Sequence, residues 1–379
     1  MTQRIPKLAV LVFMVMAVFL VACTAPSSNW PGLTADGDRV LVAFNSEVIA
    51  LNVVEQREVW RYAGEEGGVQ FFAPPSVTAE NIVLGDFGTQ RSMFSTGLTT
   101  AVYKLNNNGD APPTTNWVNA DREGGISGRV FAEPLQANDL VYVVTSDNHL
   151  VALQSSDGAK VWDVTAENAN WSQPAYGDGL IFVTSTDRNV YALDANEGTL
   201  VWQQRLEGSN AAAPILANDK LYVASFDGNL YAFEPTTGDI IWQAVADTAL
   251  WSTPTYVDGV VYFADLNGRV YAADADTGRE LWESTTQVSG SVQGGVVHNG
   301  THVFVGSAND DNSGGWLASI DMSDGRVVWE SEVPGPVHNT PGIIGESIIV
   351  AVAPNGGSLQ VIEYGTTDGA QQWLYTPSQ

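Results

Sequence analysis

From about residue 30 onward, the chain alternates apolar and polar residues in short runs separated by turns rich in Asp, Asn and Gly. The clearest unit predicts four strands, at residues 172–176, 180–183, 190–193 and 200–203. Alternation with a period of two is typical of β-strands, and these turn residues tolerate the positive φ that tight hairpins demand. Helical periodicity is absent after residue 22. The pattern therefore predicts an all-β protein built from four-stranded units.

The four-strand pattern repeats along the chain. Tryptophans and prolines recur every 40 residues, at Trp162, Trp202, Trp242 and Trp282 and at Pro134, Pro174, Pro214 and Pro254. Further Gly-x-x-x-Trp endings occur at residues 325–329 and 369–373, and Gln56 stands at the glycine place before Trp60. A degenerate unit ends at Trp117. The repeat thus predicts eight units, which are closed by Trp60, Trp117, Trp162, Trp202, Trp242, Trp282, Trp329 and Trp373.

Four antiparallel strands repeated every 40 to 45 residues or so are the signature of a propeller blade. A lone four-stranded sheet with two apolar faces cannot bury them, so neighbouring blades must cover one another around a ring. We therefore expect a single eight-bladed β-propeller domain over residues 30–379.

The unit endings resemble a known family. Residues 272–282 match the pattern Ala-x-Asp-x-x-Thr-Gly-x-x-x-Trp in full, and residues 192–202 match it with Glu197 in place of Thr. This pattern is similar to the tryptophan-docking motif of the PQQ-repeat (quinoprotein-like) propellers. The resemblance implies that each glycine makes the third turn of its blade and that each tryptophan packs on the next blade. An indole that buries roughly 150 to 250 Å² contributes roughly 4 to 6 kcal/mol, so we interpret the eight tryptophans as structural.

The first 22 residues differ from the rest of the chain. Arg4 and Lys7 are their only charges, and residues 8–22 are uninterruptedly apolar up to Cys23, the single cysteine. Such a segment is typical of an export signal. The ending Leu-Val-Ala-Cys resembles a bacterial lipobox, which implies cleavage before Cys23 and a lipid on its thiol. We thus expect a signal peptide at 1–22, a linker at 23–29 and a lipid-anchored mature protein.

The lipobox resemblance also implies a location outside the cytoplasm. Thr24 follows the cysteine, and a residue other than Asp there implies delivery to the periplasmic face of the outer membrane in a Gram-negative cell. In an organism with one membrane, the anchor would hold the protein at the outer face of the cytoplasmic membrane.

The charge balance is strongly acidic. The chain has 16 Lys and Arg against 43 Asp and Glu, a formal net charge of −27, and two of the basic residues belong to the predicted signal. Nucleic acid is excluded as a partner because binding it needs clustered basic residues. With 16% charged residues and no long acidic block, we interpret the acidity as favouring solubility.

Three insertions break the repeat, at residues 88–100, 106–116 and 309–315. The first and third join the second strand of a blade to the third, so we expect them on the face that carries the connections between blades. Loops on a rigid scaffold are common binding sites. On the same face, the residues three before the repeat proline predict a channel rim, which either packs under loops or binds a peptide or small ligand: Phe71, Phe131, Trp171, Trp251 and His338, with Ala211 in the fifth unit.

Motifs for catalysis are missing from the sequence. Haem, zinc, phosphate-loop and nucleophile-elbow motifs do not occur. A lone cysteine also rules out the adjacent-cysteine disulfide that supports the cofactor in many related alcohol dehydrogenases. We interpret His298 and His302 as flanking a surface turn, and residues 310–314 as a polar loop without the acidic residue that would complete a calcium site.

The sequence therefore favours a non-catalytic, membrane-anchored protein-binding scaffold without a cofactor. Lipobox, repeats and length together resemble the BamB family of outer-membrane assembly factors, which implies a β-barrel assembly complex and unfolded barrel precursors as partners. Two alternatives stay open: an extracytoplasmic dehydrogenase dependent on pyrroloquinoline quinone (PQQ) with calcium, and a surface sensor or solute- or peptide-binding propeller in a single-membrane bacterium. Fold-level likeness alone does not decide among them.

Overall fold

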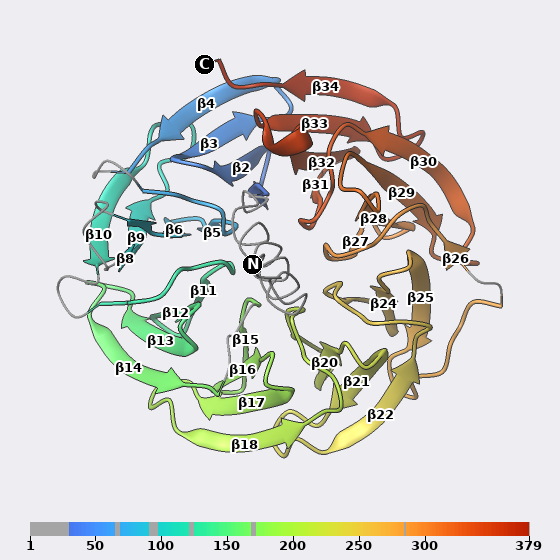
Figure 1. Cartoon of the computed structure of the whole chain (residues 1–379), viewed down its shortest axis with the longest axis horizontal. Helices are drawn as coiled ribbons and strands as arrows, with labels where there is room; N and C mark the ends of the chain where they lie inside the picture. Colours follow the sequence, from blue (N-terminus) through green and yellow to red (C-terminus); the bar gives the residue numbers. More distant parts are fainter. Residues whose placement is uncertain are drawn as a thin grey trace, which may run out of the picture.

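The computed structural model describes residues 30–64, 69–90, 98–120, 125–167, 172–283 and 286–378. Eight four-stranded antiparallel sheets stand as blades around a central axis, each with its first strand innermost and its last outermost (Figure 1). The predicted all-β class and the predicted number of blades are confirmed. Among the described residues, no helix is long and apolar enough to cross a membrane.

The first four blades are formed in chain order. Blade 1 comprises β1 (Gly32–Asp36), β2 (Arg39–Phe44), β3 (Glu47–Asn52) and β4 (Arg57–Tyr62). Blade 2 comprises β5 (Ser76–Val77), β6 (Asn81–Gly85), β9 (Ala101–Asn106) and β10 (Thr114–Ala120). Blade 3 comprises β11 (Leu135–Ala137), β12 (Leu140–Val144), β13 (His149–Gln154) and β14 (Lys160–Thr165). Blade 4 comprises β15 (Ala175–Gly177), β16 (Leu180–Thr184), β17 (Asn189–Asp194) and β18 (Leu200–Arg205).

The last four blades complete the ring. Blade 5 comprises β19 (Ile215–Ala217), β20 (Lys220–Ala224), β21 (Asn229–Phe233) and β22 (Ile240–Val245). Blade 6 comprises β23 (Thr255–Val257), β24 (Val260–Ala264), β25 (Arg269–Asp274) and β26 (Thr286–Gln287). Blade 7 comprises β27 (Val297–His298), β28 (His302–Ala308), β29 (Gly315–Asp321) and β30 (Val327–Val333). Blade 8 comprises β31 (Gly342–Ile344), β32 (Ser347–Val352), β33 (Gln360–Gly365) and β34 (Gln371–Tyr375), with a 3₁₀ turn, η2 (Pro354–Gly356), between β32 and β33.

The outer strand of most blades carries a bulge beside its tryptophan. In blade 4, for example, Ala192 pairs with Trp202 and Leu193 pairs with Leu200, so Val201 has no partner in the ladder. Val201 and the equivalent Val161 and Ile241 are 49%, 46% and 44% exposed. Bulges twist an edge strand away from flat pairing with another sheet, which explains why apolar side chains are tolerated on these rims.

The hydrophobic core lies between the blades. Each apolar cluster joins two neighbouring sheets, as where Phe182 and Val190 of blade 4 pack with Val223 and Phe233 of blade 5. These side chains occupy the faces that the alternating pattern makes apolar, and stacking the blades removes both faces from water.

The ring closes without exchange of a strand between the first and last blades. Leu33 and Val40 of blade 1 share an apolar cluster with Ile349 and Val361 of blade 8. At the rim, the Tyr375 hydroxyl donates a hydrogen bond to Glu58. Each terminal blade is thus complete in itself, and side-chain contacts alone close the circle.

The described parts of two insertions lie on the face that carries the connections between blades. Residues 88–100 include the short hairpin of β7 (Thr89–Gln90) and β8 (Leu98–Thr99), and residues 309–314 form the turn between β28 and β29. On this face, turns between second and third strands hydrogen-bond the connections, as where Phe226 N donates to Ser209 O at 2.9 Å. The insertion at 106–116 includes the turn between β9 and β10, at the opposite end of that blade.

Candidate functional site

The repeat tryptophans connect successive blades. The indole Nε1 of seven of them donates a hydrogen bond of 2.7–3.1 Å to a backbone carbonyl of the following blade; the donors are Trp60, Trp117, Trp162, Trp202, Trp242, Trp282 and Trp329. At six junctions, the indole also lies on a glycine of the third turn. A Cβ on Gly238, for instance, would lie 2.6 Å from Trp202. Only glycine permits so close an approach together with its φ of +77°.

The junction between the last and first blades is built differently. Gln56 occupies the glycine place at a φ of +54°, and its side-chain amide donates to Glu363 at 3.3 Å. Trp373 packs against the apolar cluster shared by these blades, and in the described part of the chain its indole nitrogen has no hydrogen-bond partner. The closing junction therefore lacks the indole hydrogen bond of the other seven, and it depends on apolar packing together with side-chain hydrogen bonds such as that of Gln56 with Glu363.

A cavity of about 230 Å³ lies at the mouth of the central channel, on the face of the connections between blades. Along most connections, the residues three and one before the repeat proline line the cavity, and the residue between them is more deeply buried. Phe131 and Trp251 occupy the first position, whereas Glu133 and Thr253 occupy the second. The predicted rim residues Phe131, Trp251 and His338 are thus brought together around one opening.

The assignment of Phe71 to this rim is wrong. Phe71 is 1% exposed and packs on Tyr103, with ring centroids 5.7 Å apart. Its neighbour Phe72 lines the cavity instead. Two prolines, Pro74 and Pro75, are adjacent here, and β5 begins after the second, so the repeat register is set by Pro75. Side chains alternate between channel and core, so counting from Pro74 in place of Pro75 assigned the core residue Phe71 to the channel and the channel residue Phe72 to the core.

Two other sequence predictions lie outside the described residues: the rim residue Trp171 and the lipidation site Cys23. One further rim residue was not predicted from the sequence. Trp30 is 43% exposed, lines the cavity and contacts His338, with ring centroids 4.7 Å apart. It directly precedes Pro31 and the first strand of blade 1, and the sequence prediction considered only the position three before each proline.

Aromatic side chains form an arc along one side of the mouth. Phe87, from the second-to-third-strand loop of blade 2, makes edge-to-face contacts with Phe72 and Phe131 at 5.1 and 5.2 Å. The guanidinium of Arg129 lies over the Phe87 ring at 4.7 Å. On the other side, Trp251 packs on Phe226 at 5.3 Å. The loops thus supply the support that holds the rim aromatics in place.

The ionisable groups of the mouth favour their neutral forms. Glu133 is partly exposed in the channel, and burial of its carboxyl group raises its pKa to about 8, against a smaller opposing effect of its hydrogen bond with Gln173. Burial lowers the pKa of His338 to about 4. Among the described residues that line the cavity, none is Lys or Arg. At neutral pH the described residues that line the cavity therefore form an aromatic and largely uncharged surface.

This lining does not fit pyrroloquinoline quinone. The cofactor is a polycarboxylate, and burying it requires cationic partners, whereas the described lining offers a carboxyl group and uncharged side chains.

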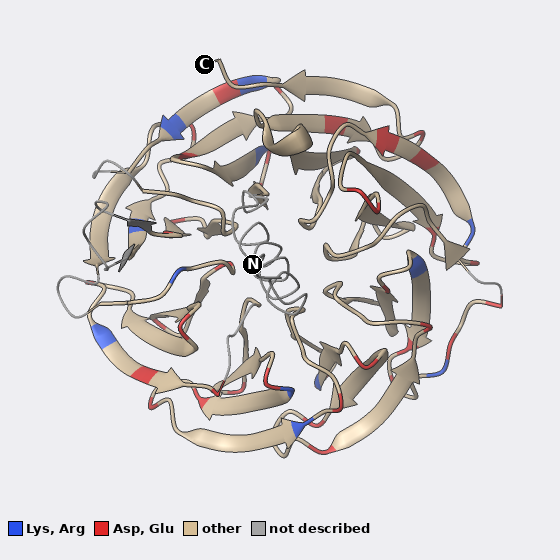
Figure 2. Cartoon of the chain, viewed as in Figure 1, with Lys and Arg blue, Asp and Glu red and all other residues tan. Residues whose placement is uncertain are grey.

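Outside the mouth, acidic residues occupy turns all around the ring, and basic residues are fewer (Figure 2). His298 and His302 flank the turn between β27 and β28, as predicted, and the Asp311 carboxylate accepts hydrogen bonds from Ser313 within its own loop. In the described ranges, no three His, Cys, Asp or Glu side chains gather as metal ligands would.

Comparison with solved structures finds the same fold. The crystal structure of BamB from Moraxella catarrhalis matches with a TM-score of 0.67 and 20% identity, over 87% of this chain and 95% of that one. The crystal structure of the computationally designed Ika8 protein matches with a TM-score of 0.70 and 12% identity, over 88% of this chain and 96% of that one. A search of curated protein sequences gives no match.

The sequence itself matches a family profile over most of the propeller. The profile is described as outer membrane protein assembly factor BamB, and it aligns with residues 123–173, 158–287 and 266–379. Together these segments span blades 3 to 8 and more than half of the chain. The chain therefore belongs to the BamB family of PQQ-repeat β-propellers.

Proposed function

We propose that the protein is a non-catalytic, lipid-anchored scaffold that assists the assembly of outer-membrane β-barrel proteins. The observation that carries this proposal is the family match over residues 123–379, whose description names outer membrane protein assembly. The partners would be a β-barrel assembly complex and unfolded barrel precursors, and Cys23 would hold the protein at the periplasmic face of the outer membrane.

The construction of the channel mouth supports binding over catalysis. Its aromatic side chains are fixed by neighbouring loops, and its carboxyl group Glu133 has a raised pKa and no cationic partner among the lining residues. A surface of this kind suits uncharged polypeptide, because desolvating it costs little. Beyond the bulge, the regular part of an exposed outer strand offers backbone groups to an extended client as a second mode of contact.

Cross-linking in the native membrane tests the proposal. The tagged full-length protein is cross-linked in cells that produce it, and covalently attached proteins are identified after denaturing purification. Recovery of a barrel-assembly protein is expected. Recovery of only unrelated surface proteins would overturn the assembly role and favour a sensor.

Two controls accompany this experiment. A Cys23→Ser variant should lose both the lipid label and the cross-links while its propeller stays folded. Dye-linked dehydrogenase activity after addition of PQQ and calcium would refute the non-catalytic assignment, and we expect none.

A further inference from the structure

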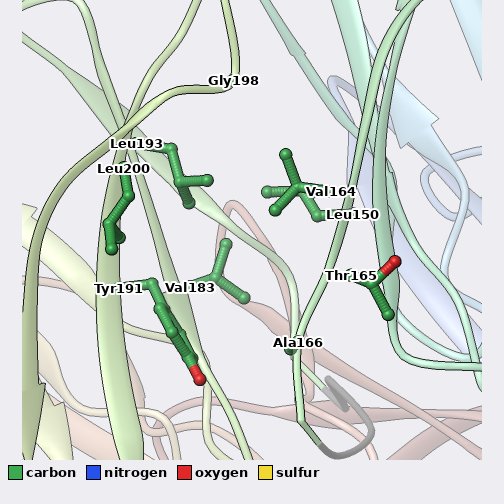
Figure 3. Close-up of a pocket in the computed structure, with 9 residues that line it drawn as sticks. All are labelled: Leu150, Val164, Thr165, Ala166, Val183, Tyr191, Leu193, Gly198 and Leu200. Carbon is green, nitrogen blue, oxygen red and sulfur yellow. The ribbon is translucent and has the colours of Figure 1, made fainter.

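A pocket of about 150 Å³ opens between blades 3 and 4, beside the junction of Trp162 (Figure 3). Leu150 and Val164 line it from blade 3, and Val183, Leu193 and Leu200 line it from blade 4. Tyr191 also borders the pocket, but its hydroxyl donates to Asp187 at 2.6 Å and is already satisfied. The walls are therefore mainly aliphatic, and an apolar cavity of roughly this size accommodates a benzene ring.

Comparison of blade 4 with blade 5 shows which side-chain group would fill the pocket. The residue opposite the start of the outer strand is Leu193 in blade 4, where it pairs with Leu200, and Phe233 in blade 5, where it pairs with Ile240. Phe233 is fully buried, and its ring stacks on Trp202 with centroids 6.1 Å apart. The benzyl group of Phe233 thus occupies, between blades 4 and 5, the place that the shorter Leu193 leaves open between blades 3 and 4.

The next junction provides an internal comparison. Ala273 holds the equivalent position in blade 6, and a pocket of about 190 Å³ lies there between blades 5 and 6. Its walls include Glu280 at the place of Leu200, together with Gln243. A carboxylate and an amide at the walls make this second pocket unfavourable for an apolar guest.

The pocket between blades 3 and 4 has an apolar opening. Leu200 at its edge is 55% exposed, and the neighbouring Val201 is 49% exposed. A side chain that entered the pocket would also cover these two residues, which adds buried apolar area next to the anchoring group. Anchors of this type in well-formed pockets dominate the energy of protein interfaces.

We propose that this pocket binds one phenyl-sized side chain of a partner polypeptide. The chain's own Phe233 defines the occupant, because it fills the equivalent place in the adjacent repeat. The inference rests on the proposed role as a protein-binding scaffold, and it assigns to that role a specific anchoring point on the rim of the ring.

Methyl NMR of the full-length propeller with labelled Leu and Val tests the proposal. The probes are N-acetyl-L-phenylalanine amide and, as the matched compound without a ring, N-acetyl-L-alanine amide. The phenylalanine compound should shift the methyl resonances of Leu150, Val164 and Val183, and the alanine compound should not.

Two filling variants separate this site from the second pocket. Leu193→Phe should weaken binding of the phenyl probe at least tenfold and should unfold at the same or a higher temperature than wild type, since it fills a cavity. Ala273→Phe fills the other pocket and should leave binding unchanged. If Leu193→Phe fails to fold, Val164→Leu narrows the pocket from the opposite wall and should also weaken binding.

Equal binding to wild type and Leu193→Phe would overturn the proposal, as would the absence of any shift in wild type. Shifts confined to residues around Ala273 would also overturn it. This outcome is independent of the cross-linking result. If the phenyl probe binds but no barrel-assembly protein is cross-linked, the assembly role is refuted and the proposal of a phenyl-binding pocket stands.

Discussion

Replacing Trp202 with alanine should destabilise the ring by removing one of its junctions. The indole of Trp202 stacks on Phe233, lies on Gly238 and donates a 2.7 Å hydrogen bond to the Pro235 carbonyl. Truncation of a packed Trp costs about 3 to 5 kcal/mol, and partial exposure of this side chain places the expected loss near the lower end. With an unfolding entropy of about 2.1 cal/mol/K per residue, a loss of about 3.5 kcal/mol lowers Tm by about 5 °C in a domain of about 350 residues.

The hydrogen bond can be separated from the packing by a milder change. Trp202→Phe keeps an aromatic ring in the junction and removes the Nε1 donor. Its free energy of unfolding should fall by about 1 kcal/mol for the lost hydrogen bond, in addition to the cost of the smaller ring. Trp373→Phe is the matched control, because in the described structure its indole nitrogen makes no hydrogen bond to lose. It should therefore cost less than Trp202→Phe.

Thermal and urea denaturation of the variants should be followed by far-ultraviolet circular dichroism, which reports on the whole ring. Tryptophan fluorescence is less suitable because the chain has 12 Trp. An unchanged midpoint for Trp202→Ala would refute the argument that the indoles hold neighbouring blades together.

Three further changes test other parts of the structure. Gly238→Ala should cost at least about 1 kcal/mol in urea denaturation, since its φ is +77° and a Cβ would lie 2.6 Å from the indole of Trp202; a neutral result would refute the close contact. Asn210→Val should raise the free energy of unfolding by about 1 to 2 kcal/mol, because the amide is fully buried and its side-chain N and O have no partners among the described residues; a loss of stability would show that these atoms are satisfied. Glu133→Gln removes the channel carboxyl group. Because the pKa of this group is raised to about 8 in the folded state, the folded protein keeps a proton that the unfolded chain releases near pH 4.5. Wild type should therefore lose stability relative to Glu133→Gln as pH rises from 5 to 8, and parallel melting curves of the two proteins over that range would contradict the raised pKa.

The spacing of Trp and Pro was sufficient to predict the blades, because each marks a fixed place in a four-stranded unit. It was not sufficient to predict which side chains face the channel. At Phe71 and Phe72, the two adjacent prolines left the register ambiguous by one residue, and in a strand one residue exchanges the two faces.

Other features depend on contacts between distant segments. The contact of Trp30 with His338 arises because the first and last blades meet, and no local sequence pattern records that contact. The pocket beside Leu193 arises from a difference between two repeats that are alike in pattern, since Leu193 and Phe233 are both apolar and differ in size and shape. The raised pKa of Glu133 likewise depends on the protein atoms that surround it.

The first and last blades are each complete, so no strand ladder pairs a strand from the beginning of the chain with one from its end. A circular permutant should therefore fold: new ends could be placed in the connection between β22 and β23, with β34 joined to β1 by a linker as long as residues 246–254. For the same reason, duplication or loss of the gene segment that encodes one blade would change the number of blades in the ring without breaking a sheet.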